Sequence, residues 1–215
     1  MMVTKILANR WLAGTLGLLL GASSWGAPPT GGVIKAEQAA KKSAPATQPA
    51  TPQTAILAGG CFWGMEELFR KVPGVLTTEV GYAGGKAAGP SYSDVSSGST
   101  GHAESLKLTY DPKVLSYEDL LKLYFRAHDP TSLNRQGNDV GTQYRSAIFY
   151  LTPEQKMAAE QVKAKVEQSH KWGKPVVTEI TAGSPFYPAE LYHQKYLVKN
   201  PNGYNDHYLR DFKFD

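Results

Sequence analysis

Cys61 is the residue with the clearest chemical potential, and it is the only cysteine among 215 residues. It follows Gly59 and Gly60 and opens a stretch whose apolar residues have helical spacing. A free thiol has a pKa of about 8.5, and the unpaired amides at a helix N-terminus stabilise the thiolate. The two glycines allow a sharp turn that exposes the sulfur. The sequence therefore predicts a nucleophilic cysteine with a lowered pKa, beside an apolar wall made by Phe62 and Trp63.

The alternative interpretation is that Cys61 is a small buried hydrophobic residue, as most single cysteines are. An unpaired thiol in an exported protein risks wrong pairing, which favours a function for this one. A single cysteine also excludes an intramolecular disulfide and a zinc site built from several cysteines.

The elements that must position this thiol alternate between strands and helices. Apolar periodicity predicts strands at 55–58, 75–82, 103–110, 146–151 and 175–181, and helices at 61–71, 116–127, 152–170 and 189–198. Residues 81–101 hold six glycines and are predicted to be one long functional loop. The order of elements predicts an α+β fold, a two-layer sandwich with a mixed sheet and a split βαβ (ferredoxin-like) core.

The first 53 residues have a different composition. Residues 1–27 are predicted to be a signal peptide, because Lys5 and Arg10 precede a short leucine-rich apolar run that small residues follow. Residues 28–53 are rich in Ala, Pro and Thr and are predicted to be a flexible linker, since they have little apolar surface to bury. The folded domain is expected at 54–215, in a protein exported to the bacterial periplasm or secreted. The alternative is that the signal is not cleaved and tethers the chain to the membrane. If the signal is cleaved, no stable membrane insertion is expected.

The net charge of +4 comes from the first 54 residues, which carry five basic residues and one acid. Residues 55–215 therefore carry 18 basic and 18 acidic residues and no net charge. A nucleic-acid partner is not expected for a folded part without excess positive charge.

Several motifs follow one another along residues 55–204. Two are long and specific: Gly60-Cys61-Phe62-Trp63-Gly64 with Glu66, and RQGNDVGTQYRS at 135–146. Shorter ones are GYAGG at 81–85, GHAE at 101–104, HDP at 128–130, FY at 186–187, AE at 189–190 and HQKY at 193–196. Together they resemble the A-type peptide methionine sulfoxide reductases, in a single-cysteine variant, and mark 54–215 as the catalytic domain of such an enzyme.

The resemblance implies a thiol-dependent oxidoreductase that reduces methionine sulfoxide, in proteins and free, to methionine, with the S-epimer as the expected substrate. Cys61 resembles the attacking cysteine, which becomes a sulfenic acid. Glu104 resembles the proton donor of the family. A carboxylic acid serves as a donor near neutral pH only when burial raises its pKa, and the apolar neighbours Ala103 and Leu106 agree with that requirement.

The resemblance assigns the rest of the site as well. Tyr92 and Tyr144 resemble the two tyrosines whose hydroxyls hold the sulfoxide oxygen, and Asp139 resembles the carboxylate that binds and orients the substrate. Phe62 and Trp63 resemble the pocket for the sulfur-bound methyl group. Taken alone, the same residues suit packing or turn roles. His102, His128 and His193 lack the regular spacing of metal ligands and are expected to be structural. Glu66 is not assigned to the site.

The chain departs from the family in lacking the resolving cysteines that many members carry. It reads Gly203-Tyr204-Asn205 where Gly-Tyr-Cys is common, and Ser96 follows Val95 in the glycine-rich region. We therefore expect an external thiol, either a thioredoxin-like protein or a small thiol, to reduce the sulfenic acid. No bound cofactor or metal is expected. The expected partners are oxidised proteins and the thioredoxin-like reductant, and the chain is expected to be a monomer.

Two other functions remain open at this point. A thiol peroxidase needs a similar thiolate and usually a nearby arginine, and Arg145 is the only basic residue in the site motifs that could serve as one. A non-catalytic module that binds methionine-rich segments through Phe62, Trp63 and Tyr92 would keep its binding without Cys61.

Overall fold

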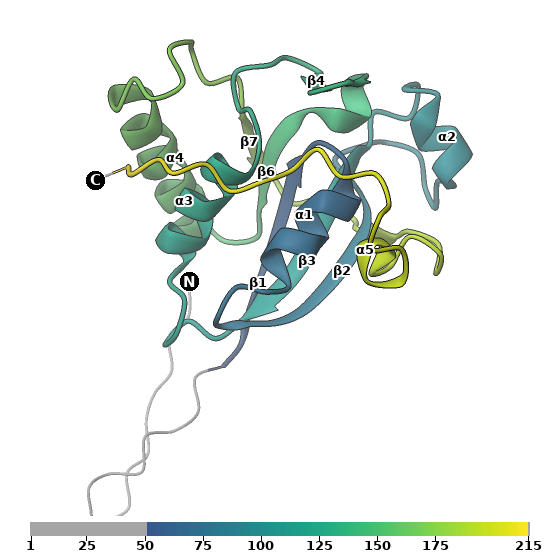
Figure 1. Ribbon diagram of the computed structural model, residues 1–215, viewed down its shortest axis with the longest axis horizontal. Coiled ribbons are helices and arrows are strands. Elements are labelled where there is room, and N and C mark those ends of the chain that lie inside the picture. Colours follow the sequence, from purple (N-terminus) through teal and green to yellow (C-terminus); the bar gives the residue numbers. More distant parts are fainter. Residues whose placement is uncertain (1–50, 215) are drawn as a thin grey trace, which may run out of the picture. The chain divides into compact units, whose positions relative to one another are not determined.

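The computed structural model describes residues 51–214, which form a six-stranded mixed sheet with helices packed against it (Figure 1). In sheet order the strands are β7 (Glu179–Ala182), β6 (Ser146–Tyr150), β1 (Gln53–Gly59), β3 (Ala103–Tyr110), β2 (Val75–Ala83) and β8 (Tyr187–Pro188). The short strands β4 (Arg135–Gln136) and β5 (Asp139–Val140) pair separately. The helices are α1 (Phe62–Phe69), α2 (Tyr92–Ser96), α3 (Tyr117–Ala127), α4 (Pro153–Gln168) and α5 (Tyr196–Lys199), and Thr142–Tyr144 form a 3-10 turn.

The centre of the sheet is the predicted split βαβ unit. Helix α1 connects β1 to β2, and β3 lies between these two strands, antiparallel to both. Strand β6 pairs antiparallel with β1, and β7 pairs parallel with β6, so the predicted mixed sheet is confirmed. This arrangement places the end of β1, the start of α1 and the start of β3 next to one another.

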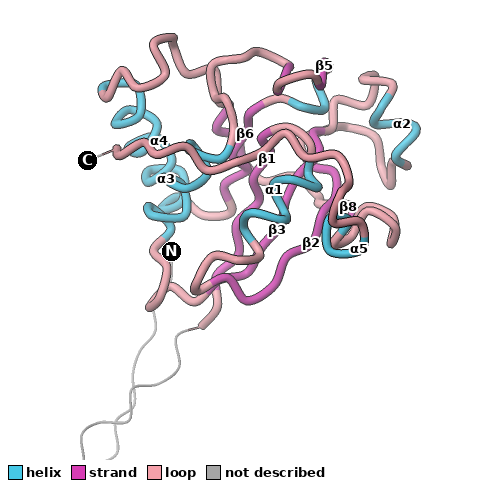
Figure 2. The backbone as a smooth tube through the Cα atoms, in the orientation of Figure 1, coloured by secondary structure: helices cyan, strands magenta, loops and turns pink. Residues whose placement is uncertain are grey.

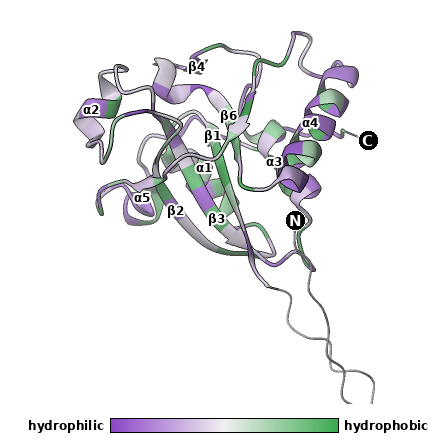
Figure 3. Cartoon of the chain, turned by 180° about the vertical axis from the view of Figure 1, so that it is seen from behind, coloured by the Kyte–Doolittle hydropathy of each residue, from purple (hydrophilic) through white to green (hydrophobic). Residues whose placement is uncertain are grey.

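The main core lies between the sheet and the helices α1, α3 and α4. Side chains of a strand alternate between the two faces, so Leu57 and Leu106 join this core while Ile56 and Ala58 join a smaller cluster on the other face. Figure 3 shows apolar residues along β1 and β3, in the middle of the sheet. Burying each large aliphatic side chain stabilises the fold by about 1.5–3 kcal/mol.

The helices α3 and α4 begin at the N-cap residues predicted from the sequence. Ser116 and Thr152 cap α3 and α4 by accepting hydrogen bonds from the backbone amides of Asp119 and Gln155, as expected for helix N-caps. The strand predicted at 55–58 begins earlier, at Gln53, and the strand predicted at 175–181 begins only at residue 179.

Two predicted elements are wrong. The helix expected at 189–198 is helical only at Tyr196–Lys199, and Lys195 before it has a left-handed backbone with a φ of 52°. The region 81–101 is not one loop, because it contains α2 (Figure 2). This helix begins with a capping box between Ser91 and Asp94.

The predicted signal peptide at 1–27 and the linker up to residue 50 lie outside the described residues. Within residues 51–214, no helix has the length and apolar character needed to cross a bilayer.

Candidate active site

Cys61 lies at the junction predicted from its flanking glycines. Strand β1 ends at Gly59, and Cys61 is the N-cap residue of α1. Gly60 between them has a φ of 101°, a region that other residues rarely adopt. A Cβ atom at this position would lie 2.5 Å from Cγ of Gln136, so the turn needs glycine for its space as well as for its backbone.

The prediction of a lowered thiol pKa is wrong for the protein without substrate. Cys61 is only 7% exposed, and this burial is the main cause that raises the pKa of its thiol. The negative charge of Glu104 raises it further, and the backbone amide of Trp63 acts in the opposite direction. The helix N-terminus therefore contributes as expected, but desolvation of the sulfur outweighs it.

Glu104 comes from the start of β3 and reaches the first turn of α1. Its Oε2 accepts a hydrogen bond of 3.0 Å from the backbone amide of Phe62, the residue directly after Cys61. The side chain is buried, and burial raises the pKa of Glu104 from 4.5 to about 8. The Phe62 amide lowers this pKa, and the nearby Asp139 and Asp206 raise it. Glu104 is therefore a protonated acid at neutral pH, beside the cysteine.

The two predicted tyrosines approach from different elements, Tyr92 at the start of α2 and Tyr144 at the end of the 3-10 turn. Burial is the main cause that raises the pKa of each, and the charges of Glu104 and Cys61 raise it further. Both hydroxyls thus stay protonated at neutral pH and are available as hydrogen-bond donors within the electrostatic reach of the cysteine.

Asp139, on the short strand β5, joins the same group of side chains. Its Oδ2 accepts a hydrogen bond of 3.1 Å from the hydroxyl of Tyr204, and its pKa is raised by partial burial and by Asp206. Sequence reasoning did not place Tyr204 in the site. It treated the segment only as the place where a cysteine is missing.

Phe62 and Trp63 differ in their surroundings. Phe62 is 1% exposed and packs into the main core against Tyr82, so it supports the site from behind. Trp63 is partly exposed, and its ring stacks on Tyr196. Both rings lie near His193, and the indole of Trp63 is the one that remains open to solvent.

The C-terminal segment is a second feature that sequence reasoning missed. It runs from α5 past the start of α1 towards α3 and α4 (Figure 1). The buried His207 bonds the carbonyl of Gly59 through Nε2 at 2.8 Å, and its Nδ1 lies 2.6 Å from Oδ1 of Asp206. Further on, Arg126 and Arg210 bond each other's backbone carbonyls. In this chain the segment is fixed across the cysteine turn.

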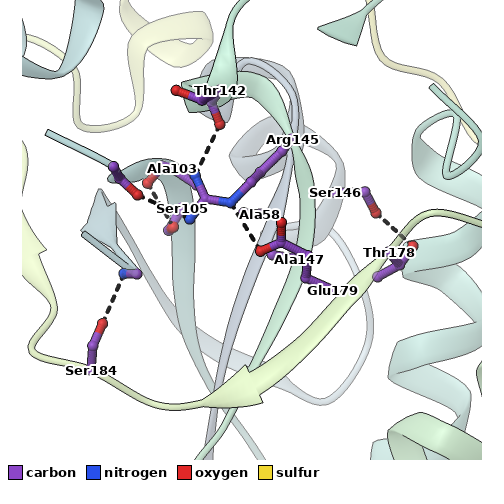
Figure 4. A network of polar contacts seen from close by, with 12 residues as sticks. Ala58, Ala103, Ser105, Thr142, Arg145, Ser146, Ala147, Thr178, Glu179 and Ser184 are labelled. Atoms are coloured by element: carbon purple, nitrogen blue, oxygen red, sulfur yellow. Dashed lines mark hydrogen bonds and ion pairs between the residues drawn. The ribbon is translucent and has the colours of Figure 1, made fainter. Parts of the chain in front are cut away.

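Arg145 is engaged elsewhere and does not serve as the arginine of a peroxidase site. Its Nε pairs with Glu179 at 3.2 Å, and its other two nitrogens bond the backbone carbonyls of Thr142 and Gly101 at 2.9 and 3.1 Å (Figure 4). These contacts hold the segment that carries Tyr144 against the sheet edge.

Glu66 and His128 make hydrogen bonds that stabilise the fold. Glu66 is buried and accepts hydrogen bonds from Thr78 and from the backbone amide of Lys195, so it anchors the segment before α5. His128 bonds the carbonyl of Tyr124 and the hydroxyl of Ser146. Within residues 51–214, no three His, Cys, Asp or Glu side chains form a group that could hold a metal ion.

Comparison with known proteins identifies what this arrangement is similar to. The family model for peptide methionine sulfoxide reductases matches residues 53–213. The peptide methionine sulfoxide reductase MsrA of Azorhizobium caulinodans is 56% identical over 155 residues, which are 71% of each chain. The crystal structure of reduced Mxr1 from Saccharomyces cerevisiae superposes with a TM-score of 0.70 at 43% identity, covering 76% of this chain and 94% of that one. Mxr1 in complex with Trx2 gives a TM-score of 0.50 at 30% identity, covering 76% and 93%.

Proposed function

Because the chain belongs to the peptide methionine sulfoxide reductase family and is an oxidoreductase that reduces methionine sulfoxide to methionine, we propose that it does so by transferring the sulfoxide oxygen to Cys61. The sulfur of Cys61 attacks the sulfoxide sulfur, and Glu104 protonates the oxygen. One observation carries this proposal: a carboxyl group with a pKa of about 8 is bonded to the residue next to the only cysteine.

The protons and electrons of this step balance within the site. Glu104 gives its proton to the sulfoxide oxygen, and the Cys61 thiol gives its own proton to the Glu104 carboxylate. The sulfur–oxygen bond of the substrate breaks as the oxygen becomes bonded to Cys61. Methionine sulfoxide gains two electrons and Cys61 loses two, which gives methionine and a sulfenic acid. A raised thiol pKa is compatible with this order, because the thiol ionises as the oxygen is protonated.

The other side chains bind the substrate. Tyr92 and Tyr144 donate hydrogen bonds to the sulfoxide oxygen, since their raised pKa values keep both hydroxyls protonated. Asp139, held by Tyr204, helps to bind and orient the substrate. The partly exposed ring of Trp63, backed by Phe62, takes the methyl group. Preference for the S-epimer belongs to this proposal and rests on the family resemblance.

An external thiol must regenerate the enzyme, because the chain has no second cysteine. The thiol attacks the sulfenic acid, forms a mixed disulfide with Cys61 and releases water. A second thiol then frees Cys61 and leaves as a disulfide. We propose a thioredoxin-like protein as the reductant, supported by the complex of the related Mxr1 with thioredoxin Trx2. A small thiol that supports turnover equally well would contradict this choice.

We further propose that the chain is exported and acts as a monomer on oxidised proteins. The signal-like residues 1–27 support export to the periplasm or secretion. N-terminal sequencing of the mature protein would find a start just after Ser24 or Ala27 if the signal is cleaved, and Met1 or Met2 if it remains as a tether. Size-exclusion chromatography with light scattering tests the monomer.

The mechanism is tested by one turnover without reductant. We expect one methionine per enzyme and a mass increase of one oxygen atom on Cys61. The variant Cys61→Ser should form neither product while still binding the sulfoxide. An unmodified Cys61 after methionine has formed would refute direct oxygen transfer to this sulfur.

A further inference from the structure

The indole of Trp63 is held on two sides. Its face stacks on Tyr196, with ring centroids 3.8 Å apart and 14° between the planes. Its Nε1 donates a hydrogen bond of 3.0 Å to Nδ1 of His193. A ring whose face is covered and whose only donor is bonded has one defined orientation. The partly exposed indole ring, two residues after Cys61 in the chain, is thus fixed by contacts from the 190–196 segment.

His193 is itself immobilised. It is 1% exposed, and its ring lies against the rings of Phe62 at 5.1 Å, Tyr92 at 4.5 Å and Tyr192 at 4.2 Å. Burial lowers the pKa of His193, so the ring is neutral at pH 7 and Nδ1 is free to accept the indole proton. The ring hydrogen then lies on Nε2, which is 4.0 Å from Oε2 of Glu190.

Glu190, three residues before His193, connects the same segment to the oxygen side of the site. Its Oε1 accepts a hydrogen bond of 2.9 Å from the backbone amide of Tyr92, and its Oε2 accepts one of 2.9 Å from the hydroxyl of Tyr82. A single segment therefore sets both the methyl wall and the start of the helix that carries an oxygen-binding tyrosine. The mechanism above leaves His193 and Glu190 without a chemical step, although both lie at its edge.

We propose that His193 is a positioning residue that sets substrate specificity: by binding the indole N–H it holds Trp63 in the orientation that admits a methyl group on the sulfoxide sulfur and excludes larger alkyl groups. The inference rests on the proposed function, in which the substrate sulfur lies beside Cys61. An apolar pocket distinguishes one methylene by about 10–200-fold when its walls are rigid. A ring free to tilt loses that discrimination.

The test compares methyl and ethyl aryl sulfoxides with dithiothreitol as reductant. His193→Phe keeps an aromatic ring between its neighbours but accepts no hydrogen bond. We expect kcat/KM for the methyl substrate to fall roughly tenfold and the methyl-to-ethyl ratio to narrow at least about fivefold. His193→Asn, whose Oδ1 accepts from a similar place, should restore much of the ratio. Tyr192→Phe is the matched control, because it loses only an exposed hydroxyl beside the same ring, and it should keep the wild-type ratio.

A double-mutant cycle shows whether His193 acts through the indole N–H. Trp63→Phe removes the same hydrogen bond from the other partner, so it should narrow the ratio alone, and adding His193→Phe should change it no further. Trp63→Phe also carries the test if His193→Phe does not fold. An unchanged ratio in folded His193→Phe, or effects of the two substitutions that multiply, would overturn the proposal. Failure of the wild type to oxidise Cys61 would instead refute the proposed function, so the two failures are distinguishable.

Discussion

Replacing Glu104 by glutamine tests the proton donor with little disturbance of the fold. Glutamine has nearly the same shape, and its side-chain oxygen can still accept the hydrogen bond from Phe62 that the carboxyl accepts at 3.0 Å. The amide cannot donate a proton to the sulfoxide oxygen as an acid does. The substitution thus removes the acid and keeps the contact that holds β3 against the start of α1.

The size of the effect follows from general acid catalysis, which contributes about 10²–10⁴-fold when the donor is well placed. We expect Glu104→Gln to lower the rate of the oxygen-transfer step within that range and to leave the affinity for sulfoxide largely unchanged. With a pKa of about 8, the wild-type acid is about 90% protonated at pH 7 and about 10% protonated at pH 9. The wild-type rate should therefore fall several-fold across this interval, and the residual rate of the variant should lack that decline.

Stability gives an independent check on the same carboxyl group. Its pKa in the folded chain lies above the unfolded value of 4.5, so its contribution to stability is full below pH 4.5 and is lost as the pH rises through about 8. The melting temperature of the wild type should therefore decrease from pH 5 to pH 9 by more than that of Glu104→Gln.

The assay is single-turnover quenched flow with a methyl sulfoxide, followed over pH 6 to 9. Glu67→Gln is a suitable control, because Glu67 lies on α1 but pairs with Arg70 and Lys71 at the surface. The control should keep the wild-type rate and pH profile. A Glu104→Gln rate within twofold of the wild type, or a decline near pH 8 that persists in the variant, would refute the role of this carboxyl as the acid.

Three further substitutions test other parts of the site. Tyr144→Phe should lower kcat/KM by roughly 10–150-fold with an unchanged melting temperature, since a hydrogen bond of about 1.5–3 kcal/mol to the developing charge is lost. Gly60→Ala should destabilise the fold by more than about 1 kcal/mol in urea unfolding, because its Cβ would lie 2.5 Å from Gln136 at a φ of 101°. Tyr204→Phe frees Asp139 and should raise KM several-fold with little change in kcat; an unchanged KM would argue that Tyr204 has no part in binding.

The turn around Cys61 could be predicted because its causes are local. Two glycines after an apolar strand and before helical spacing indicate a sharp strand-to-helix turn, and the structure has Gly60 at a positive φ at this point. The caps Ser116 and Thr152 were readable for the same reason, since each bonds a backbone amide three residues later. Short-range hydrogen bonds leave a clear pattern in the sequence.

The segment 189–198 could not be predicted because its contacts are distant in the sequence. Its spacing suits a helix, yet Gln194 bonds both backbone groups of Val80, and Glu190 bonds Tyr82 and Tyr92. These partners lie about a hundred residues away, and they draw the side chains out of a helical path. Tyr192 and Tyr196 lie in this segment, but spacing alone could not show that their rings pack on His193 and Trp63.

The thiol pKa was predicted wrongly because two opposing effects act on it, the helix N-terminus and burial, and only the first can be recognised in the sequence. A helix N-terminus is visible in the sequence, whereas the burial of the sulfur depends on residues brought in by the whole fold. Here burial is the main cause that raises the pKa of both Cys61 and Glu104. The free enzyme consequently holds a proton on each group. Reduction of a sulfoxide needs a proton for the sulfoxide oxygen and a cysteine sulfur that loses its proton. Burial of the site lowers the fraction of thiolate in the free enzyme and keeps Glu104 protonated. We therefore predict that the acid, more than the helix dipole, limits the chemistry as the pH rises through about 8.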